Sequence, residues 1–368
     1  MKNTLQNILK FLIFLGLGLG ILYFVYQNQN EAYQAQCALD GVAKADCSLM
    51  QKVVNDFKSV HLDWLGAAFI AYLISNISRA LRWQMLLKSL GSSTRFINSF
   101  LTIMLGLFAN LGFPRLGEVL RPVTLAKYEE IPVEKVLGTI VVDRTMDVLS
   151  LLIIVSIAFF LEFDTLWGYL SENMVSDKGG TGLLGNPIVL GILGSGLLGL
   201  VLIFIFREKI QATAIYGKVK QILLGFLDGI LSIRNLEKPW LFIVYSVLIW
   251  AGYYLMFYFY MPAFGPTAHL GLTVALMTFV FGTFGIVIPS PGGMGTYHFL
   301  IIACLTLYGV NDGDAFSSAN ISFFATHFAN ILFGLAAVLL LPIVNKHYQP
   351  TPLVEVGKKR TPKKAEMA

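Results

Sequence analysis

Long apolar runs separated by short polar segments dominate the chain. About 20 apolar residues are needed for a helix to cross the hydrocarbon core of a bilayer. Full-length runs of this kind lie at residues 8–26, 62–83, 136–161, 187–206, 240–261 and 316–344. The pattern predicts an all-α, polytopic helical bundle with one membrane domain over residues 1–345.

Two further apolar stretches are interrupted. Residues 96–113 end at Pro114, and residues 270–310 are broken by the sequence IPSPGGMGTYH between Ile288 and His298. Proline and glycine remove amide donors and helix propensity, so the backbone must break there. A broken backbone at membrane depth is buried in protein or lines a watery cavity. We predict six full spans with two re-entrant hairpins, or about eight spans if both halves of 270–310 cross.

Composition supports a membrane protein over a soluble one. Hydrophobic residues make up 56% of the 368 residues and charged residues 13%, against about 25% charged in soluble domains. The net charge of +5 does not indicate nucleic-acid binding, because the basic residues cluster at membrane edges. Residues 346–368 are read as a basic, disordered cytoplasmic tail.

The distribution of charge also predicts an orientation. Basic residues mark one side of the membrane and acidic loops mark the other, which places the N- and C-termini in the cytoplasm. Residues 96–135 then begin and end inside, whereas 262–315 begin and end outside. This layout predicts an inverted repeat of residues 62–161 and 240–344. Cys37 and Cys47 share the first outer loop, where a disulfide and two free thiols are both open alternatives.

Several charged residues lie where lipid or a helix bundle would surround them. Arg115, Glu118 and Arg121 are spaced by three, so one arginine can stay free for a phosphate after Glu118 neutralises another. Asp143, Arg144 and Asp147 lie in or beside a long apolar helix, where charges usually face a cavity or the bundle interior. Arg79 and Arg82 close the second span as snorkelling anchors. An anionic headgroup is the natural partner of these residues.

The broken stretch supplies a second group of candidate binding residues. Gly292, Gly293 and Gly295 would let a phosphate oxygen approach backbone amides where the helix resumes, and His298 adds a side chain. His327 lies one helix later in an apolar span, where packing is a more common role than proton relay. No nucleotide loop, metal-binding spacing or nucleophile motif is present, so no metal or cofactor is expected and a transporter is favoured over an enzyme.

Four motifs in this order resemble those of the lysylphosphatidylglycerol synthase transmembrane-domain family, over residues 8–345. They are NISRALRW at 76–83, PRLGEVLR at 114–121, VDRTMD at 142–147 and PSPGGMG at 289–295. This family is the flippase-like membrane portion of the bacterial multiple peptide resistance factor. The resemblance implies a multi-pass protein of the bacterial inner membrane that moves a lipid with a charged headgroup.

The resemblance also limits the expectation. Full-length members carry a soluble aminoacyl-transferase domain after the membrane part, and this chain ends soon after its last span, so synthase activity and tRNA binding are not implied. His298 stands where many members have an acidic residue, which puts a carboxylate role there in doubt. The alternative function is a membrane enzyme or accessory subunit acting on polyprenyl or isoprenoid phosphate or glycolipid. The oligomeric state is left open.

Overall fold

The structure, a computed structural model, describes residues 47–168 except 114, residues 236–350 except 289, and most of residues 16–38. These residues form helices, with no strand among them. Four of the helices are long and apolar enough to cross a membrane: α3 (Leu62–Ser89), α6 (Val133–Leu161), α11 (Pro239–Ala263) and α14 (Asp312–Val344). Shorter elements are α2 (Leu49–Lys58), α4 (Phe96–Gly112), α5 (Leu116–Glu129), η2 (Gly265–Thr267), α12 (Leu272–Val287), η3 (Pro291–Gly293) and α13 (Thr296–Leu307).

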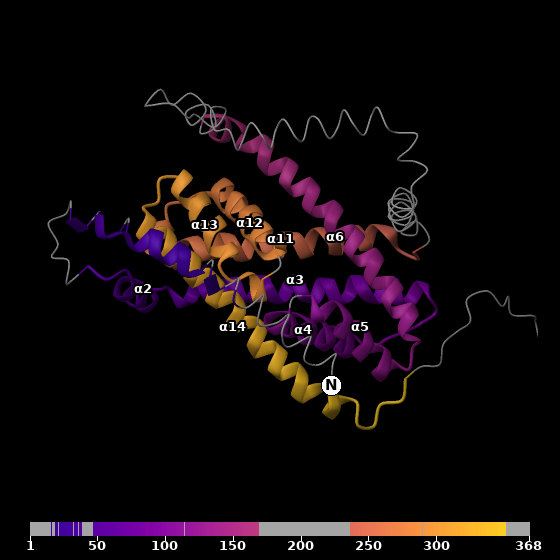
Figure 1. Cartoon of the computed structure of the whole chain (residues 1–368). Coiled ribbons are helices and arrows are strands. Elements are labelled where there is room, and N and C mark those ends of the chain that lie inside the picture. Colours follow the sequence, from indigo (N-terminus) through magenta and orange to yellow (C-terminus); the bar gives the residue numbers. More distant parts are fainter. Residues whose placement is uncertain are drawn as a thin grey trace, which may run out of the picture.

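Helices α3 and α11 form the central pair of the bundle (Figure 1). Their contacts run in opposite order along the two helices: Trp64 with Phe259, Ser75 with Ile249, and Lys88 with Glu237. The helices are therefore antiparallel. Their close approach depends on Gly252, because a Cβ at that position would lie 2.8 Å from the Cβ of Ser75.

Helices α4 and α5 form one hairpin, and α12 and α13 form another. Both ends of the α4–α5 hairpin lie together, since Glu129 at the end of α5 accepts a hydrogen bond from the backbone N–H of Arg95 before α4. Helices α3 and α14 end at this same side of the bundle. Arg95, which follows α3, also donates a hydrogen bond to the carbonyl oxygen of Val344 at the end of α14. The α12–α13 hairpin has its ends at the opposite side, where Tyr254 contacts Leu272.

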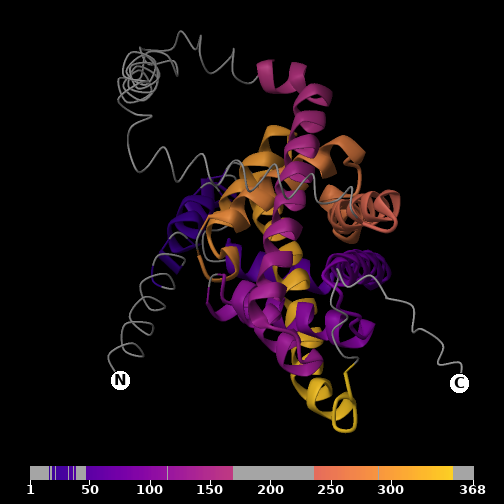
Figure 2. The ribbon, with the colours of Figure 1, turned by 90° about the vertical axis from the view of Figure 1, so that its right-hand side faces the viewer.

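Helices α6 and α14 cross the central pair obliquely (Figures 1 and 2). The α4–α5 hairpin packs against α14, and α12 packs against α6. At the tips of the two hairpins, α4 contacts η3, which lies in the break between α12 and α13. The fold thus brings the interruption between α12 and α13 against α4, whereas the interruption between α4 and α5 is exposed.

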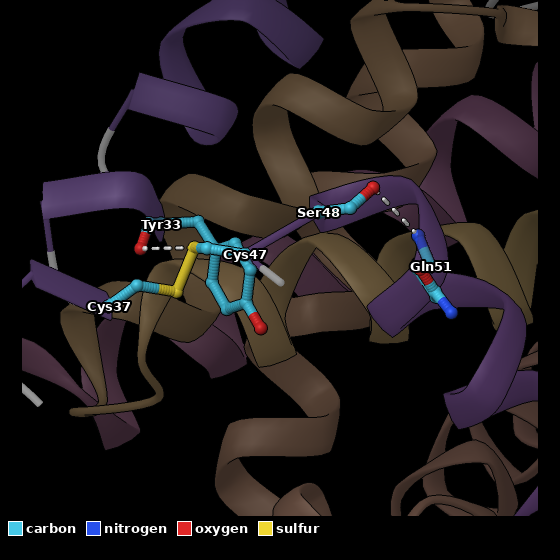
Figure 3. The surroundings of a disulfide bond; sticks show 5 residues. All are labelled: Tyr33, Cys37, Cys47, Ser48 and Gln51. Carbon is cyan, nitrogen blue, oxygen red and sulfur yellow. Dashed lines mark hydrogen bonds between the residues drawn. A yellow bond between two sulfur atoms is a disulfide. The ribbon is translucent and has the colours of Figure 1, made fainter. Parts of the chain in front are cut away.

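Helix α2 packs across the beginning of α14, and a disulfide precedes it. Cys37 and Cys47 are bonded to each other (Figure 3), which selects one of the two alternatives that the sequence left open. The side chain of Ser48 caps α2 by accepting a hydrogen bond from the N–H of Gln51. The disulfide lies at the end of the bundle where α14 begins.

Lys52 ties α2 to α14. Its Nζ lies 2.6 Å from Asp56 and 2.5 Å from Asp314, and Ser317 also donates to Asp56. Burial alone would lower the pKa of Lys52, but the hydrogen bonds and charges of Asp314 and Asp56 outweigh it and raise the pKa above its ordinary value of 10.5.

Lys52→Met is expected to lower the free energy of unfolding by about 1–3 kcal/mol, because it leaves two neighbouring carboxylates without their donor. Since the folded state raises the pKa of Lys52, its contribution is complete below the ordinary value of 10.5 and is lost as the pH rises through the raised value. The difference in Tm between the native protein and the variant should therefore stay constant up to pH ~10 and narrow only as the pH rises above ~10.5. Lys58→Met, on the exposed side of the same helix, is the control; an equal effect of both variants would contradict the role of the network.

The prediction of an all-α, polytopic membrane fold is confirmed. The predicted spans 62–83, 136–161, 240–261 and 316–344 correspond to α3, α6, α11 and α14. The predicted span 187–206 and the tail beyond residue 350 lie outside the described residues, as does much of 8–26.

Candidate functional site

A buried group of charged side chains joins α3, α5 and α6. At its centre is Asp143 of α6, whose side chain is fully buried. Its Oδ1 lies 2.6 Å from Arg82 Nη2, and its Oδ2 lies 3.3 Å from Arg121 Nη1 and 3.8 Å from Arg79 Nη1. One carboxylate therefore faces arginines from two other elements. We call Arg79, Arg82, Arg121, Asp143 and Asp147 the arginine cluster.

Asp147 extends the cluster by one helical turn. Its two oxygens each lie 2.6 Å from an arginine, Oδ2 from Arg79 and Oδ1 from Arg82. Residues four apart share a face of a helix, so α6 presents Asp143 and Asp147 together. Arg79 and Arg82 are three apart on α3 and meet them from the facing helix. The sequence of each helix thus places two charged residues on one face, and the packing of α3 against α6 brings the two faces together.

Aromatic and hydroxyl side chains hold the arginines in place. The guanidinium of Arg121 lies over the ring of Trp83, 3.8 Å from its centroid, and Trp83 Nε1 donates to Thr139 Oγ1. Such stacking suits the planar arginine group. Arg82 Nη1 donates to Ser246 Oγ, 3.1 Å away on α11. The site is therefore a preorganised arrangement supported by four helices.

The charges of the cluster do not cancel. Three arginines face two aspartates, so three positive charges against two negative leave one positive charge in excess. All five side chains are buried; Arg121 is 4% exposed. Among the described residues, Nε and Nη2 of Arg121 and Nε of Arg79 have no hydrogen-bond partner. Buried donors of this kind are costly to leave unpaired.

A half-exposed ion pair lies at the edge of the cluster. Arg144 Nε is 3.6 Å from Glu118 Oε1, with side chains 43% and 41% exposed, and Arg144 Nη1 is 3.4 Å from Asp147. Arg115 is exposed at the tip of the α4–α5 hairpin and adopts a positive φ of 65°. The edge of the cluster thus lies at the surface of the bundle, whereas its centre is buried.

The glycine motif forms the tip of the other hairpin. Gly292, Gly293 and Gly295 all have positive φ values, of 59°, 79° and 83°, a conformation that L side chains rarely adopt. At Gly292 a side chain would also collide with His327, because a Cβ there would lie 2.5 Å from His327 Nε2. His298 is 2% exposed and its ring lies 4.5 Å from that of Phe323.

The sequence-predicted residues other than Arg115, which is exposed at the α4–α5 tip, therefore fall into two groups. Arg79, Arg82, Glu118, Arg121, Asp143, Arg144 and Asp147 meet in or beside the arginine cluster, whereas Gly292, Gly293, Gly295, His298 and His327 meet at the α12–α13 tip. Within the described part of the chain, no hydrogen bond, ion pair or ring contact joins one group to the other. There too, no three His, Cys, Asp or Glu side chains are placed to hold a metal ion.

Two expectations about individual residues were wrong. Arg79 and Arg82 are not snorkelling anchors, since they are 8% and 0% exposed and point to aspartates of α6. Glu118 does not neutralise an arginine of its own helix; it pairs with Arg144 of α6. In both cases the charged side chain pairs with a residue of another helix, instead of facing water or pairing within its own helix.

Sequence reasoning assigned no role to Trp83 or Ser246. Trp83 lies in the NISRALRW motif and directly follows Arg82, and that position was its only signal. Ser246 lies in an otherwise apolar helix, where a lone hydroxyl usually bonds its own backbone, as it also does here to the carbonyl of Phe242. Its bond to Arg82 could be found only from the packing of α11 on α3.

The chain is similar to known membrane proteins. Residues 42–334 match the family described as Lysylphosphatidylglycerol synthase TM region. A UPF0104 membrane protein of Methanocaldococcus jannaschii is 33% identical over 101 residues, which is 27% of this chain. That match spans 30% of the length of the relative. No solved structure matches the chain significantly.

Proposed function

We propose a transport function for this chain, which belongs to the lysylphosphatidylglycerol synthase TM region family. In this proposal the protein is a flippase that moves a phospholipid or related lipid with a charged headgroup across a bilayer, and the arginine cluster binds the headgroup. The proposed substrate is therefore a membrane lipid.

The excess buried positive charge is the observation that carries the proposal. An anion would neutralise it, and the unpaired Nε and Nη2 of Arg121 offer the two parallel donors that suit a phosphate. The half-exposed pair of Arg144 and Glu118 marks a route by which a polar headgroup would approach. A purely structural ion-pair group would be expected to balance its charges and satisfy its donors.

The arrangement of the helices supports alternating access. Exchanging α3, α4, α5 and α6 for α11, α12, α13 and α14 converts the principal contacts of one half into those of the other: α3 with α4 becomes α11 with α12, and α4 with α14 becomes α12 with α6. Because α3 and α11 are antiparallel, we infer that the halves are inverted repeats. Transporters of this design place their site at the repeat interface.

Helix length supports hairpins that re-enter the membrane. Helices α4, α5, α12 and α13 contain 17, 14, 16 and 12 residues, or about 18–26 Å at 1.5 Å per residue. The hydrocarbon core is about 30 Å thick. We therefore favour hairpins that enter and leave on one side over two additional full spans.

Charge and the disulfide support one orientation. The disulfide and the acidic start of α14 lie at one end of the bundle, and disulfides persist in oxidising compartments. Lys88, Arg95 and Lys238 lie near the opposite end, as expected for a cytoplasmic face. We place the protein in the bacterial inner membrane with both termini in the cytoplasm.

Arg121→Gln is expected to reduce lipid translocation about tenfold or more, a loss of roughly 1.4 kcal/mol of headgroup binding. The fold should survive, because Asp143 keeps Arg82 and Arg79. The measurement is the flipping of fluorescent phosphatidylglycerol in proteoliposomes, with thermal unfolding as a check on folding.

Lys127→Gln is the matched control, since it removes an exposed positive charge from the same helix. It should leave translocation nearly unchanged. Equal rates for the native protein and Arg121→Gln, or no flipping above protein-free vesicles, would contradict the proposal. Arg144→Ala and Glu118→Ala test the edge of the cluster in the same assay.

A further inference from the structure

His327 bridges α14 to the broken tip of the α12–α13 hairpin. Its Nδ1 lies 2.8 Å from the carbonyl oxygen of Phe323, and its Nε2 lies 3.1 Å from the carbonyl oxygen of Gly292. Gly292 permits this approach because it lacks a Cβ, which would meet Nε2 at 2.5 Å. Both ring nitrogens of one histidine thus face hydrogen-bond acceptors.

This geometry suits only one protonation state. A neutral imidazole carries one N–H and one lone pair, whereas an imidazolium donates from both nitrogens. Carbonyl oxygens only accept, so a neutral His327 can satisfy one of them and must turn a lone pair toward the other. Only the charged ring can donate a hydrogen bond to both carbonyl oxygens at once. The ring of Phe323, stacked 3.8 Å away between centroids, also favours a cation on its face.

The surroundings leave this charge without a carboxylate partner among the described residues. His298 of α13 contacts the same Phe323 ring, and Tyr297 beside it bonds Ser322. The other titratable groups that face this stretch of α14 are Tyr260 of α11, bonded to Thr326, and Tyr72 of α3, bonded to Asn330.

Within the part of the chain that the structure describes, more distant groups do not supply a countercharge either. Helix α4 and the segment η3 contain no titratable side chain. The carboxylate of Asp314, at the start of α14, lies 13 residues or about 20 Å along the helix. The side chain of His327 is itself partly exposed at the surface of the bundle.

We propose that His327 is a proton-binding site that holds the α12–α13 tip against α14 when it is occupied and releases the tip when the proton leaves. This inference rests on the proposed transport function and adds that lipid movement is coupled to protons. The proton comes from water, binds the free ring nitrogen and completes the second hydrogen bond. When the proton is lost, the lone pair of a ring nitrogen again faces a carbonyl oxygen, which weakens the bridge between His327 and Gly292.

Cysteine labelling at the tip tests this site without reference to lipid. Met294 is partly buried beside the break, whereas Ile288 before the break is 44% exposed. The test compares labelling of Met294→Cys with that of Ile288→Cys, since the ratio cancels the pH dependence of the thiol reagent. We expect the ratio to rise about threefold from pH ~5.5 to ~8, the range in which imidazole titrates.

The variant that tests the assignment is His327→Gln, whose amide still donates to Gly292 but does not titrate. Its labelling ratio should be the same at both pH values. His298→Gln, which alters the other histidine on the Phe323 ring, should keep the shift of the native protein. A shift that persists in His327→Gln, or a native ratio that does not change with pH, would overturn the proposal.

Lipid flipping measured on the same samples separates this inference from the proposed function. Flipping that is pH-dependent in the native protein and flat in His327→Gln is the expected result. If lipid flipping is observed but the labelling ratio does not change with pH, the proposed proton site is overturned and the proposed transport function stands. A labelling shift without any flipping would retain the proton-controlled tip but overturn its coupling to lipid transport.

Discussion

Asp143→Asn is expected to lower the free energy of unfolding by about 3–5 kcal/mol, the cost of breaking a buried ion pair from one side. The amide keeps the shape of the side chain but removes its charge. Arg121 then loses its ion pair with Asp143, at 3.3 Å, and the buried excess in the arginine cluster rises from one positive charge to two. Thermal unfolding in detergent, together with the yield of folded protein after extraction, measures this loss.

Glu118→Gln is the matched control for Asp143→Asn. It removes the same kind of charge from a pair whose side chains are 43% and 41% exposed, and exposed pairs contribute about 0–1 kcal/mol. The two variants should therefore differ severalfold in their effect on stability. A small effect of Asp143→Asn would show that the arginines reach water or another anion, in contradiction to the buried arrangement.

Gly117→Val is expected to prevent the α4–α5 hairpin from closing. A Cβ at Gly117 would lie 2.0 Å from the carbonyl oxygen of Gly106 and 2.8 Å from Oδ1 of Asn110. The nearest atom is backbone, so the helices must separate. The same movement would break the hydrogen bond that the Gly117 N–H donates to Asn110 Oδ1, whose N···O distance is 2.7 Å. The cost should exceed the ordinary 1–3 kcal/mol of an overpacked core, and little folded protein should be recovered.

Gly112→Val provides the comparison within the same hairpin. A Cβ at Gly112 meets nothing within 4 Å, so this variant should fold nearly as well as the native protein. Size-exclusion profiles of both variants in detergent give the test. Equal recovery of the two would contradict the close packing of α4 on α5.

Hydropathy predicted four of the described membrane helices within a few residues because each long apolar run has one stable solution in a bilayer. The broken segments were also located correctly, since proline and glycine prevent a continuous helix at residues 288–295 whatever packs around them. The sequence left two topologies open, re-entrant hairpins and additional full spans. Whether a short apolar helix crosses or returns depends on its neighbours, here α14 for one hairpin and α6 for the other.

For the candidate site too, the sequence predicted some features and the packing of the helices decided the others. Arg79, Arg82, Asp143 and Asp147 were recognisable because charges in apolar segments are costly and usually serve a purpose. Their partners were not, and two local interpretations failed. The i,i+3 spacing of Glu118 and Arg121 suggested a pair on α5, yet each turns to a residue of α6. The low exposure of Arg82 followed from the packing of α3 against α6 and α11, which sequence spacing does not report.

By itself, then, the sequence determined that this is a multi-pass helical membrane protein with two interrupted segments and charges at membrane depth, because hydropathy and helix propensity act along the chain. Only the tertiary structure decided which charges meet, that they leave one positive charge unbalanced around Arg121, and that His327 contacts Gly292. Those outcomes depend on residues far apart in the sequence, 22 positions for Arg121 and Asp143, 35 for His327 and Gly292, and 61 for Arg82 and Asp143. Helix packing brings such residues together, and it is a property of the whole bundle.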